Sequence, residues 1–369
     1  MNGVYERRLY EDARKDALRI VDKNLDVFTD GYPHVSQDHV YRREENALWT
    51  CSFFPGMCYL AYELSGDKKY LKHTRDYLDS FEERLRLRRN ITHDLGFLYT
   101  LSCVAAYKLT GDERAEKIAR EAARMLCERY NEKGKYIQAW GEMGIGYPNV
   151  KIIIDTMLNL PLLYWTGEAE QTQIAKNHAT TAADYLIRKD YTSYHTYLMN
   201  PETGEAVCGK THQGYADEST WARGQAWAVY GFALSYAYTK EERFLTVARK
   251  TAEVFIKNLP KDSVPYWDFT FTDGNPDLRD TSAGAIFACG LLELCNLVGE
   301  EEQKRYHDIV NKVMTSLYEN YALKSERSNG VLGEGVYHRD DGANECVIWG
   351  DYFYMEALTR ILTDWERYW

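Results

Sequence analysis

The chain has 369 residues, of which 45% are hydrophobic and 27% are charged, which is typical of an ordinary globular protein. Its formal net charge of −11 argues against nucleic acid or an anionic membrane as a partner. We expect neither a signal peptide nor a transmembrane helix, because no apolar run has the required length. The eight cysteines form no Cys-x-x-Cys pair, so we expect reduced thiols and a cytoplasmic protein.

The first predicted element is an amphipathic helix over residues 4–29. An aromatic-rich apolar stretch from Phe53 to Leu64 follows, then a turn at Ser65-Gly66-Asp67 and a polar amphipathic helix from Lys68 to Leu85. This unit of an apolar helix, a turn and a charged helix recurs along the whole chain. The apolar face of the first helix carries Leu9, Ala13, Ala17, Ile20, Val21 and Leu25.

Two kinds of helix alternate in this repeat. Apolar helices begin near residues 53, 94, 152, 222, 282 and 347, and charged helices near 4, 67, 112, 168, 241 and 300. A helix that is apolar nearly all round is buried, and one with a polar face lies outside. The pattern therefore predicts an all-α fold, an (α/α)6 barrel of six inner and six outer helices, closed where the first helix meets the last. The alternative is an open α-solenoid, whose repeats are usually more regular.

Strand signals are few. Residues 191–215 predict a hairpin around Asn200-Pro201-Glu202-Thr203-Gly204. No linker interrupts the pattern, so we expect residues 1–369 to form one domain. The connections before the inner helices vary greatly in length, and long loops at one end of a barrel are where function concentrates.

The most apolar window, residues 151–165, carries a carboxylate, Asp155, near its start. A buried carboxylate has a raised pKa, which suits a general acid, although Asp is also a favoured helix N-cap. Asp94 starts the neighbouring inner helix. Two carboxylates on adjacent helix starts can reach one small ligand, and repulsion keeps one protonated while the other stays ionised. From the pattern, this pair is the best candidate for catalysis.

Other polar residues at the inner-helix starts have simpler interpretations. Asp280 and Asp351 are expected to be helix caps. His93 is expected to be a hydrogen-bonded loop residue and no metal ligand, because no second His or Cys sits at ligand spacing. Tryptophans at these junctions suit either sugar stacking or the core, namely Trp140, Trp221 and Trp227.

Five motifs in order carry a family resemblance: Trp49–Gly56, His93–Phe97, Ile154–Leu163, Trp221–Trp227 and Ile348–Tyr352. Together they resemble the unsaturated glucuronyl hydrolases, glycoside hydrolase family 88, over nearly the whole chain. The resemblance implies the barrel described above. It also implies a substrate left by polysaccharide lyases, an oligosaccharide with a 4,5-unsaturated uronic acid at its non-reducing end. One departure is Ser52, where family members commonly have Gly.

The resemblance implies hydration of an enol ether, C4=C5–O5. By this resemblance Asp155 protonates C4 and then helps to deprotonate the attacking water, while Asp94 stays ionised, holds ring hydroxyls and stabilises the cation. No metal and no organic cofactor is implied. The residues expected to bind the uronate are His195, Gln213 and Arg223; those expected to wall the pocket are Trp140, Trp221 and Trp227; the rest of the substrate-binding set is Trp49, His93 and Tyr337.

Several alternatives stay open. Family members that prefer sulfated chondroitin fragments carry Ser and Lys before the last inner helix, where this chain has Asp340 and Asp341, so the sequence favours unsulfated substrates. An unsaturated rhamnogalacturonyl hydrolase typically has Arg-Gly-Asn-Gly-Trp where this chain has Arg-Gly-Gln-Ala-Trp at 223–227. An isomerase on the same barrel should show several histidines on inner helices, and a non-catalytic sugar-binding barrel would not need buried acids. The chain could act as a monomer or a homodimer.

Overall fold

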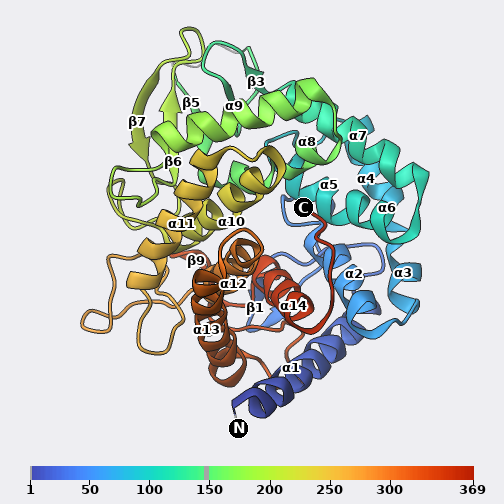
Figure 1. The fold of residues 1–369 in the computed structure, drawn as a ribbon. Coiled ribbons are helices and arrows are strands. Elements are labelled where there is room, and N and C mark those ends of the chain that lie inside the picture. The colour runs from blue at the N-terminus through green and yellow to red at the C-terminus, as the bar shows by residue number, and fades with distance from the viewer. Residues whose placement is uncertain (1, 145–148) are drawn as a thin grey trace.

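A computed structural model describes residues 2–144 and 149–369 of the chain. These residues form the predicted all-α fold, an (α/α)6 barrel (Figure 1). The inner elements are, in chain order, α2 (Phe53–Ser65), the run α5 (Leu95–Tyr99), η1 (Thr100–Val104) and α6 (Ala105–Thr110), then η2 (Ile154–Leu158) with α8 (Pro161–Trp165), α10 (Ala222–Thr239), α12 (Thr281–Cys295) and α14 (Ile348–Leu362).

The outer layer follows the predicted alternation. Its elements are α1 (Asn2–Leu25), α3 (Lys69–Thr74) with α4 (Tyr77–Arg86), α7 (Glu113–Cys127), α9 (Ala169–Tyr185), α11 (Glu242–Lys257) and α13 (Glu300–Ser316), which a π-helical turn η3 (Leu317–Tyr321) extends. Inner α14 packs against both α12 and α2, and α1 packs on α14. The first and last helices therefore close the ring, as the alternation predicts.

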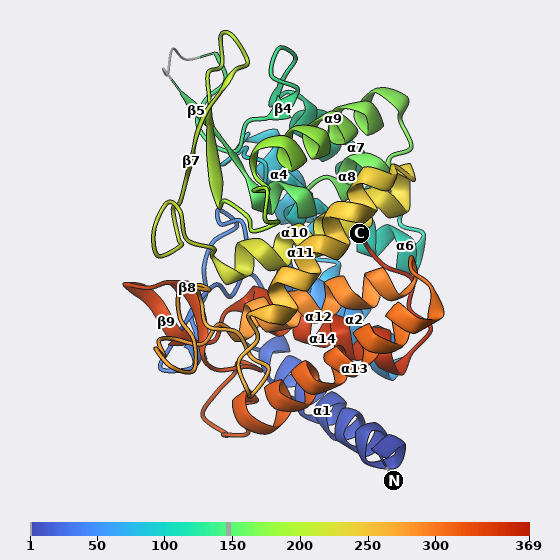
Figure 2. The same cartoon turned by 60° about the vertical axis from the view of Figure 1, so that its left-hand side comes forward.

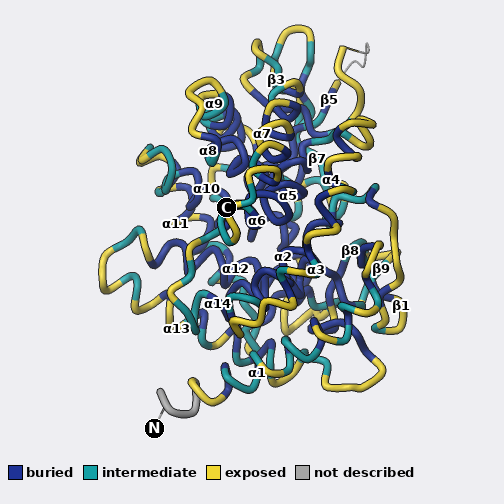
Figure 3. The backbone as a smooth tube through the Cα atoms, turned by 90° about the vertical axis from the view of Figure 1, so that its right-hand side faces the viewer, coloured by how far each residue is buried: buried dark blue, intermediate teal, exposed yellow. Residues whose placement is uncertain are grey.

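Burial separates the two layers in the way that the sequence predicts (Figure 3). All residues of the inner helix α12 are buried, and they include no charged side chain except Glu293. The outer helix α13 buries one face through Tyr306, Val310 and Val313 and exposes charged residues on the other. A helix enclosed on every side must be apolar all round, whereas a surface helix needs only one apolar stripe.

The third inner element corrects the prediction of a helix from residue 152. Val150–Ile153 form the strand β5, η2 is a single 3-10 segment, and the α-helix begins only at Pro161. Three consecutive isoleucines, Ile152 to Ile154, are β-branched and favour a strand. The partner that decides the matter is distant in sequence, because β5 pairs with β6 (Thr196–Met199) through Ile153 and Thr196.

Two further helices differ in detail from the prediction. The outer helix expected over 68–85 is interrupted between α3 and α4. The inner helix expected from residue 94 is continuous, but its middle turn, η1, is π-helical. Such turns widen a helix by one residue and are frequent near functional sites.

Short strands gather with the long loops at one end of the barrel. The predicted hairpin is present as β6 and β7 (Ala206–Lys210), and β5 adds a third antiparallel strand. This sheet and the hairpin of β8 (Gly335–His338) and β9 (Asp341–Glu345) project from the same side of the molecule (Figure 2). The remaining described strands have two residues each and form two hairpins: β1 (Ser36–Gln37) with β2 (Val40–Tyr41), and β3 (Tyr130–Asn131) with β4 (Tyr136–Ile137).

The last residues of the chain fold back into the ring, and the C-terminal end lies near its middle in Figure 1. The Trp369 ring is fully buried and stacks on Phe353 of α14. All eight cysteines are free thiols, and six of them are buried. Among the described residues no helix is long and apolar enough to cross a membrane.

Candidate active site

The two candidate aspartates lie at the loop end of the barrel, on neighbouring inner elements. Asp155 lies within the 3-10 turn η2, two residues after the N-cap residue Ile153. Asp94 occupies the N-cap position of α5, but its carboxylate accepts no capping hydrogen bond. Capping therefore does not account for either residue at these positions.

A glycine allows the two elements to approach closely. A Cβ on Gly96 would lie 2.2 Å from the Cα of Asn159, so the backbone of η2 fills the space of a side chain. Asn159 then bridges the elements: its Oδ1 accepts a hydrogen bond from the Phe97 N–H at 2.6 Å, and its Nδ2 donates to the Asp155 carbonyl at 3.3 Å. The negative charge of Asp94 is close enough to contribute to the raised pKa of Asp155.

Asp155 is a buried carboxylate that lacks a full set of partners. Its side chain is 17% exposed, and its Oδ2 atom is buried without a hydrogen-bond partner among the described residues. Burial raises its pKa to about 7, the positive charge of Arg223 lowers it, and Asp94 raises it further. A carboxyl group with this pKa is partly protonated at neutral pH, as a general acid requires.

His195 faces Asp155 in a defined protonation state. Its Nδ1 accepts hydrogen bonds from the backbone N–H groups of His212 and Gln213, at 3.0 and 3.1 Å. The ring proton therefore resides on Nε2, which lies 3.9 Å from Asp155 Oδ2. Burial is the main cause that holds the pKa of His195 well below its ordinary value, so the ring is neutral. It can donate one hydrogen bond into the site.

Asp94 is held by its own loop. Its Oδ2 accepts a hydrogen bond from Thr92 Oγ1 at 2.8 Å, and its Oδ1 lies 3.4 Å from His93 Nε2. The other ring nitrogen of His93 is 2.7 Å from Thr156 Oγ1, on the residue next to Asp155. A chain of polar contacts thus links the two acidic elements. Burial lowers the pKa of His93. This is consistent with the prediction of a loop histidine that forms hydrogen bonds with its neighbours.

Arg223 is the expected ligand of the uronate, and it is already engaged inside the protein. It is 1% exposed and pairs with Asp280 at 2.9 Å. It also donates hydrogen bonds to the backbone carbonyls of Val336 and Tyr337, and Gln213 donates to the same Tyr337 carbonyl at 2.7 Å. In this arrangement Arg223 and Gln213 tie the β8 strand to the site, while the charge of Arg223 also reaches Asp155.

Aromatic rings surround the two acids. The Trp221 ring lies 4.3 Å from the ring of His195, and the Trp140 ring is in edge contact with that of His93 at 6.3 Å. Trp49, Trp140 and Tyr337 are half-buried, so each keeps exposed surface for a ligand. Such rings stack on the apolar faces of sugars.

Trp227 is a correction to the expected pocket wall. Its side chain is fully buried, and its ring packs on Phe97 and Phe353 in the barrel core. It lies in the buried part of α10, a helix enclosed by the other inner helices, so it has no exposed surface on which a sugar could stack.

The two aspartates expected to be caps behave differently. Asp280 caps α12, because its side chain accepts a hydrogen bond from the Ser282 N–H. Asp351 lies inside α14 and caps nothing, which corrects the prediction. Its oxygens accept hydrogen bonds from the N–H groups of Val331 and Leu332 and from the Tyr41 hydroxyl, so it fixes a loop.

Sequence reasoning missed the polar residues that support the two acids. Thr92 and Thr156 each stand next to a predicted site residue, and that adjacency was the available signal. Arg129 was not signalled: it donates hydrogen bonds to three backbone carbonyls, including those of Ile91 and Gly141, and so joins the Asp94 loop to the Trp140 loop.

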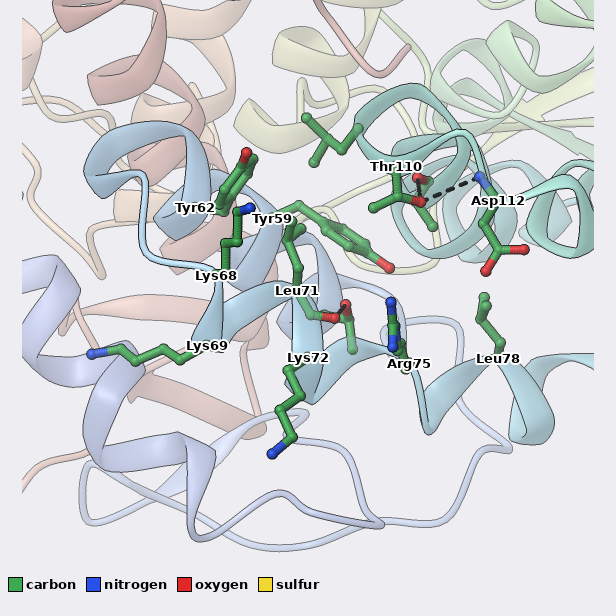
Figure 4. Close-up of a pocket in the computed structure, with 13 residues that line it drawn as sticks. Tyr59, Tyr62, Lys68, Lys69, Leu71, Lys72, Arg75, Leu78, Thr110 and Asp112 are labelled. Atoms are coloured by element: carbon green, nitrogen blue, oxygen red, sulfur yellow. Dashed lines mark hydrogen bonds between the residues drawn. The ribbon is translucent and has the colours of Figure 1, made fainter.

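A large surface hollow lies away from these acids. It measures about 840 Å³ and is lined by α2, α3 and the turn between α6 and α7 (Figure 4). Its single carboxylate among the described lining residues, Asp112, caps α7 through the Arg114 and Ala115 N–H groups. In Figure 4 the side chains of Lys69 and Lys72 extend away from Tyr59. The hollow therefore lacks a carboxylate pair for acid–base chemistry.

No group of three or more metal-ligating side chains is found within residues 2–144 and 149–369. The chemistry available at the described site is that of one carboxyl group poised near neutral pH, a second carboxylate and a neutral imidazole donor. This combination suits acid–base catalysis on a sugar.

The fold and the family comparison define the chain as a glycoside hydrolase. Residues 20–365 match the model of Glycosyl Hydrolase Family 88, and the chain belongs to this family. It is 41% identical to the unsaturated chondroitin disaccharide hydrolase of Streptococcus agalactiae, over 97% of this chain and 93% of that protein. It is also 41% identical to the unsaturated glucuronyl hydrolase of Bacillus sp. (strain GL1), over 98% and 99% of the two chains.

The solved structures agree with the sequence relatives. The crystal structure of unsaturated glucuronyl hydrolase from Streptococcus agalactiae superimposes with a TM-score of 0.94 at 40% identity, covering 98% of this chain and 94% of that one. The expected fold and family are therefore confirmed, and an open solenoid is excluded.

Proposed function

We propose that this enzyme hydrates the C4=C5 double bond of an unsaturated uronic acid at the non-reducing end of an oligosaccharide and so releases that sugar. The observation that carries the proposal is Asp155, a carboxyl group near a second carboxylate, with a pKa of about 7 and a buried oxygen that has no partner in the described part of the chain. The names of the two relatives, which act on unsaturated chondroitin disaccharide and unsaturated glucuronyl substrates, support the same reaction.

In the proposed reaction the protonated Asp155 gives its proton to C4. The double-bond electrons form the C4–H bond, and the positive charge is shared by C5 and the ring oxygen. The Asp155 carboxylate then accepts a proton from water as the water oxygen bonds to C5. The resulting hemiketal collapses, the ring opens and the second sugar leaves. The anomeric carbon is never attacked, so the carboxylate separation that distinguishes retaining from inverting glycosidases does not apply.

The neighbouring residues have distinct roles in this proposal. The Asp94 carboxylate holds ring hydroxyls and stabilises the cation. The Nε2–H of His195 donates to the substrate from a fixed tautomer. Trp49, Trp140 and Tyr337 offer exposed ring surface to the sugars. Arg223 binds the uronate only if substrate displaces a carbonyl partner; otherwise its charge acts across the site.

The experiment follows the ultraviolet absorbance of the conjugated uronate with a panel of lyase-generated disaccharides. Turnover should appear as loss of this absorbance. The value of kcat/KM should fall about tenfold per pH unit above about pH 7, because the free enzyme then loses the Asp155 proton. A panel with no turnover, or a kcat/KM that stays constant through pH 9, would contradict the proposal.

A rhamnogalacturonyl substrate is not favoured, because the two relatives are named for unsaturated chondroitin disaccharide and unsaturated glucuronyl substrates. Gln225, which stands where that family typically has Asn, is fully buried and has every polar group engaged, accepting from Ser193 N–H and donating to the Tyr191 and Thr251 carbonyls. The free cysteines support our inference of a cytoplasmic enzyme.

A further inference from the structure

Lys151 is a cation to which the proposed reaction assigns no role. It lies at the mouth of the candidate active site, at the loop end of the barrel. It lies on β5, where it pairs with Leu198 of β6, and its carbonyl accepts the Ala139 N–H at 2.9 Å. This bond places Lys151 beside the loop that carries Trp140. Lys151 is half-buried as a residue, and its Nζ lies 5.5 Å from the centre of the Trp140 ring.

The charge of Lys151 has no anionic partner among the residues that the structure describes. None of the ion pairs among residues 2–144 and 149–369 includes it, and residues 145–148 carry no acidic side chain. Other cations near the site are engaged within the protein: Arg223 pairs with Asp280 at 2.9 Å, Arg339 lies 3.7 Å from Asp277, and Arg129 donates hydrogen bonds to three backbone carbonyls. An unpaired cation is unexpected beside a catalytic site in a chain with a net charge of −11.

The two sides of the mouth carry opposite charges. On one side Lys151 lies near Trp140 and His212, whose rings are 5.2 Å apart; burial and then the charge of Lys151 lower the pKa of His212. On the other side the β8–β9 turn exposes Asp340 and Asp341. Figure 2 shows the β5–β7 sheet and this hairpin projecting together. An anionic group at the mouth is therefore attracted to the β5 side and repelled by the hairpin.

We propose that Lys151 is a specificity-determining residue that binds a sulfate ester on the second sugar of the substrate. The inference rests on the proposed function, which places the unsaturated ring against Asp155 and leaves the second sugar at the mouth. There Trp140 provides a stacking surface and Lys151 the contact for the anion. The proposal replaces the expectation of unsulfated substrates, which considered only the region before the last inner helix.

The test compares kcat/KM for two unsaturated chondroitin disaccharides that differ only by a 6-sulfate on the second sugar. Lys151→Gln should lower the value for the sulfated disaccharide about tenfold, mainly through KM, and leave the unsulfated one unchanged. Lys151→Arg should retain the preference for sulfate. The matched control is Arg339→Gln, which removes a paired cation from the same end and should change the ratio of the two kcat/KM values far less than Lys151→Gln does.

Salt gives a second readout. The sulfate preference of the wild-type enzyme should shrink as ionic strength rises, and Lys151→Gln should lack this dependence. If both disaccharides are turned over and Lys151→Gln changes them equally, the assignment of Lys151 is wrong while the proposed function stands. If the wild-type enzyme turns over neither disaccharide, the proposed function is wrong and the assignment falls with it.

Discussion

The closed end of this barrel, opposite the long loops, and the Asp155 position at the loop end bury carboxylates in opposite ways. At the closed end, Glu356 accepts hydrogen bonds from Tyr230, Arg360 and Trp369, and Glu293 pairs with Arg360 and Arg367. At the loop end, Asp155 keeps a buried oxygen that has no hydrogen-bond partner within residues 2–144 and 149–369. A buried charge with all partners in place holds a fold together, whereas one left incomplete costs stability and is available for chemistry.

Asp351 shows that a raised pKa alone does not distinguish the two cases. Burial raises its pKa to about 7, as it does for Asp155. Its oxygens, however, accept hydrogen bonds from Val331, Leu332 and Tyr41. Our assignment of Asp155 as the catalytic acid is a proposal that rests on the combination of an incomplete hydrogen-bond set among the described residues, a position among the loops and a second carboxylate nearby.

The largest expected effect comes from Asp155→Asn. This change keeps the shape of the side chain but can neither supply nor accept the proton, so kcat should fall by about 10²–10⁴-fold. Asp94→Asn should also lower kcat and should raise KM more, because it weakens contacts to ring hydroxyls. Steady-state kinetics on an unsaturated disaccharide measures both. Near-wild-type turnover by Asp155→Asn would refute its role.

Asp155→Asn should also change the free energy of unfolding, and the change should depend on pH. The folded state binds the Asp155 proton more tightly than the unfolded chain, whose pKa is 3.8. Ionising Asp155 in the folded protein therefore lowers the free energy of unfolding. This destabilisation is absent below about pH 4, grows as the pH rises to about 7 and is constant above, reaching roughly 4 kcal/mol at most. Denaturant unfolding should show Asp155→Asn more stable than wild type at pH 8 and equal at pH 4. A variant less stable at both values would contradict this account.

At the closed end the consequences should be reversed. Glu356→Gln removes one charge from a paired cluster, and the free energy of unfolding should fall by about 3 kcal/mol, near the low end for a broken buried pair because Arg360 retains Glu293. The value of kcat for the folded protein should stay at the wild-type level. Urea unfolding together with kcat at low temperature measures both, and a large loss of kcat in folded protein would show that the ends are not independent.

Much of this could be predicted from the sequence because local pattern decides it. The alternation of apolar and charged helices predicted the barrel. The position of Asp155 in the most apolar window made it the candidate general acid. The strand at 150–153 could not be predicted, since its partner β6 lies about 45 residues away. The engagement of Arg223 with Asp280 and the burial of Trp227 also depend on contacts between distant elements. Lys151 begins the same apolar window as Asp155, although it was not among the predicted site residues. A charged residue at the start of that window could have indicated it.

The central claim is that Asp155 carries a proton at neutral pH, and infrared spectroscopy can test it directly. The carboxyl stretch that is present in the wild-type protein and lost in Asp155→Asn should titrate with a midpoint near pH 7; a parallel difference spectrum with Asp351→Asn separates the second buried acid. A midpoint near pH 4 would mean that Asp155 is an ordinary ionised carboxylate, and it would contradict the assignment of Asp155 as the general acid.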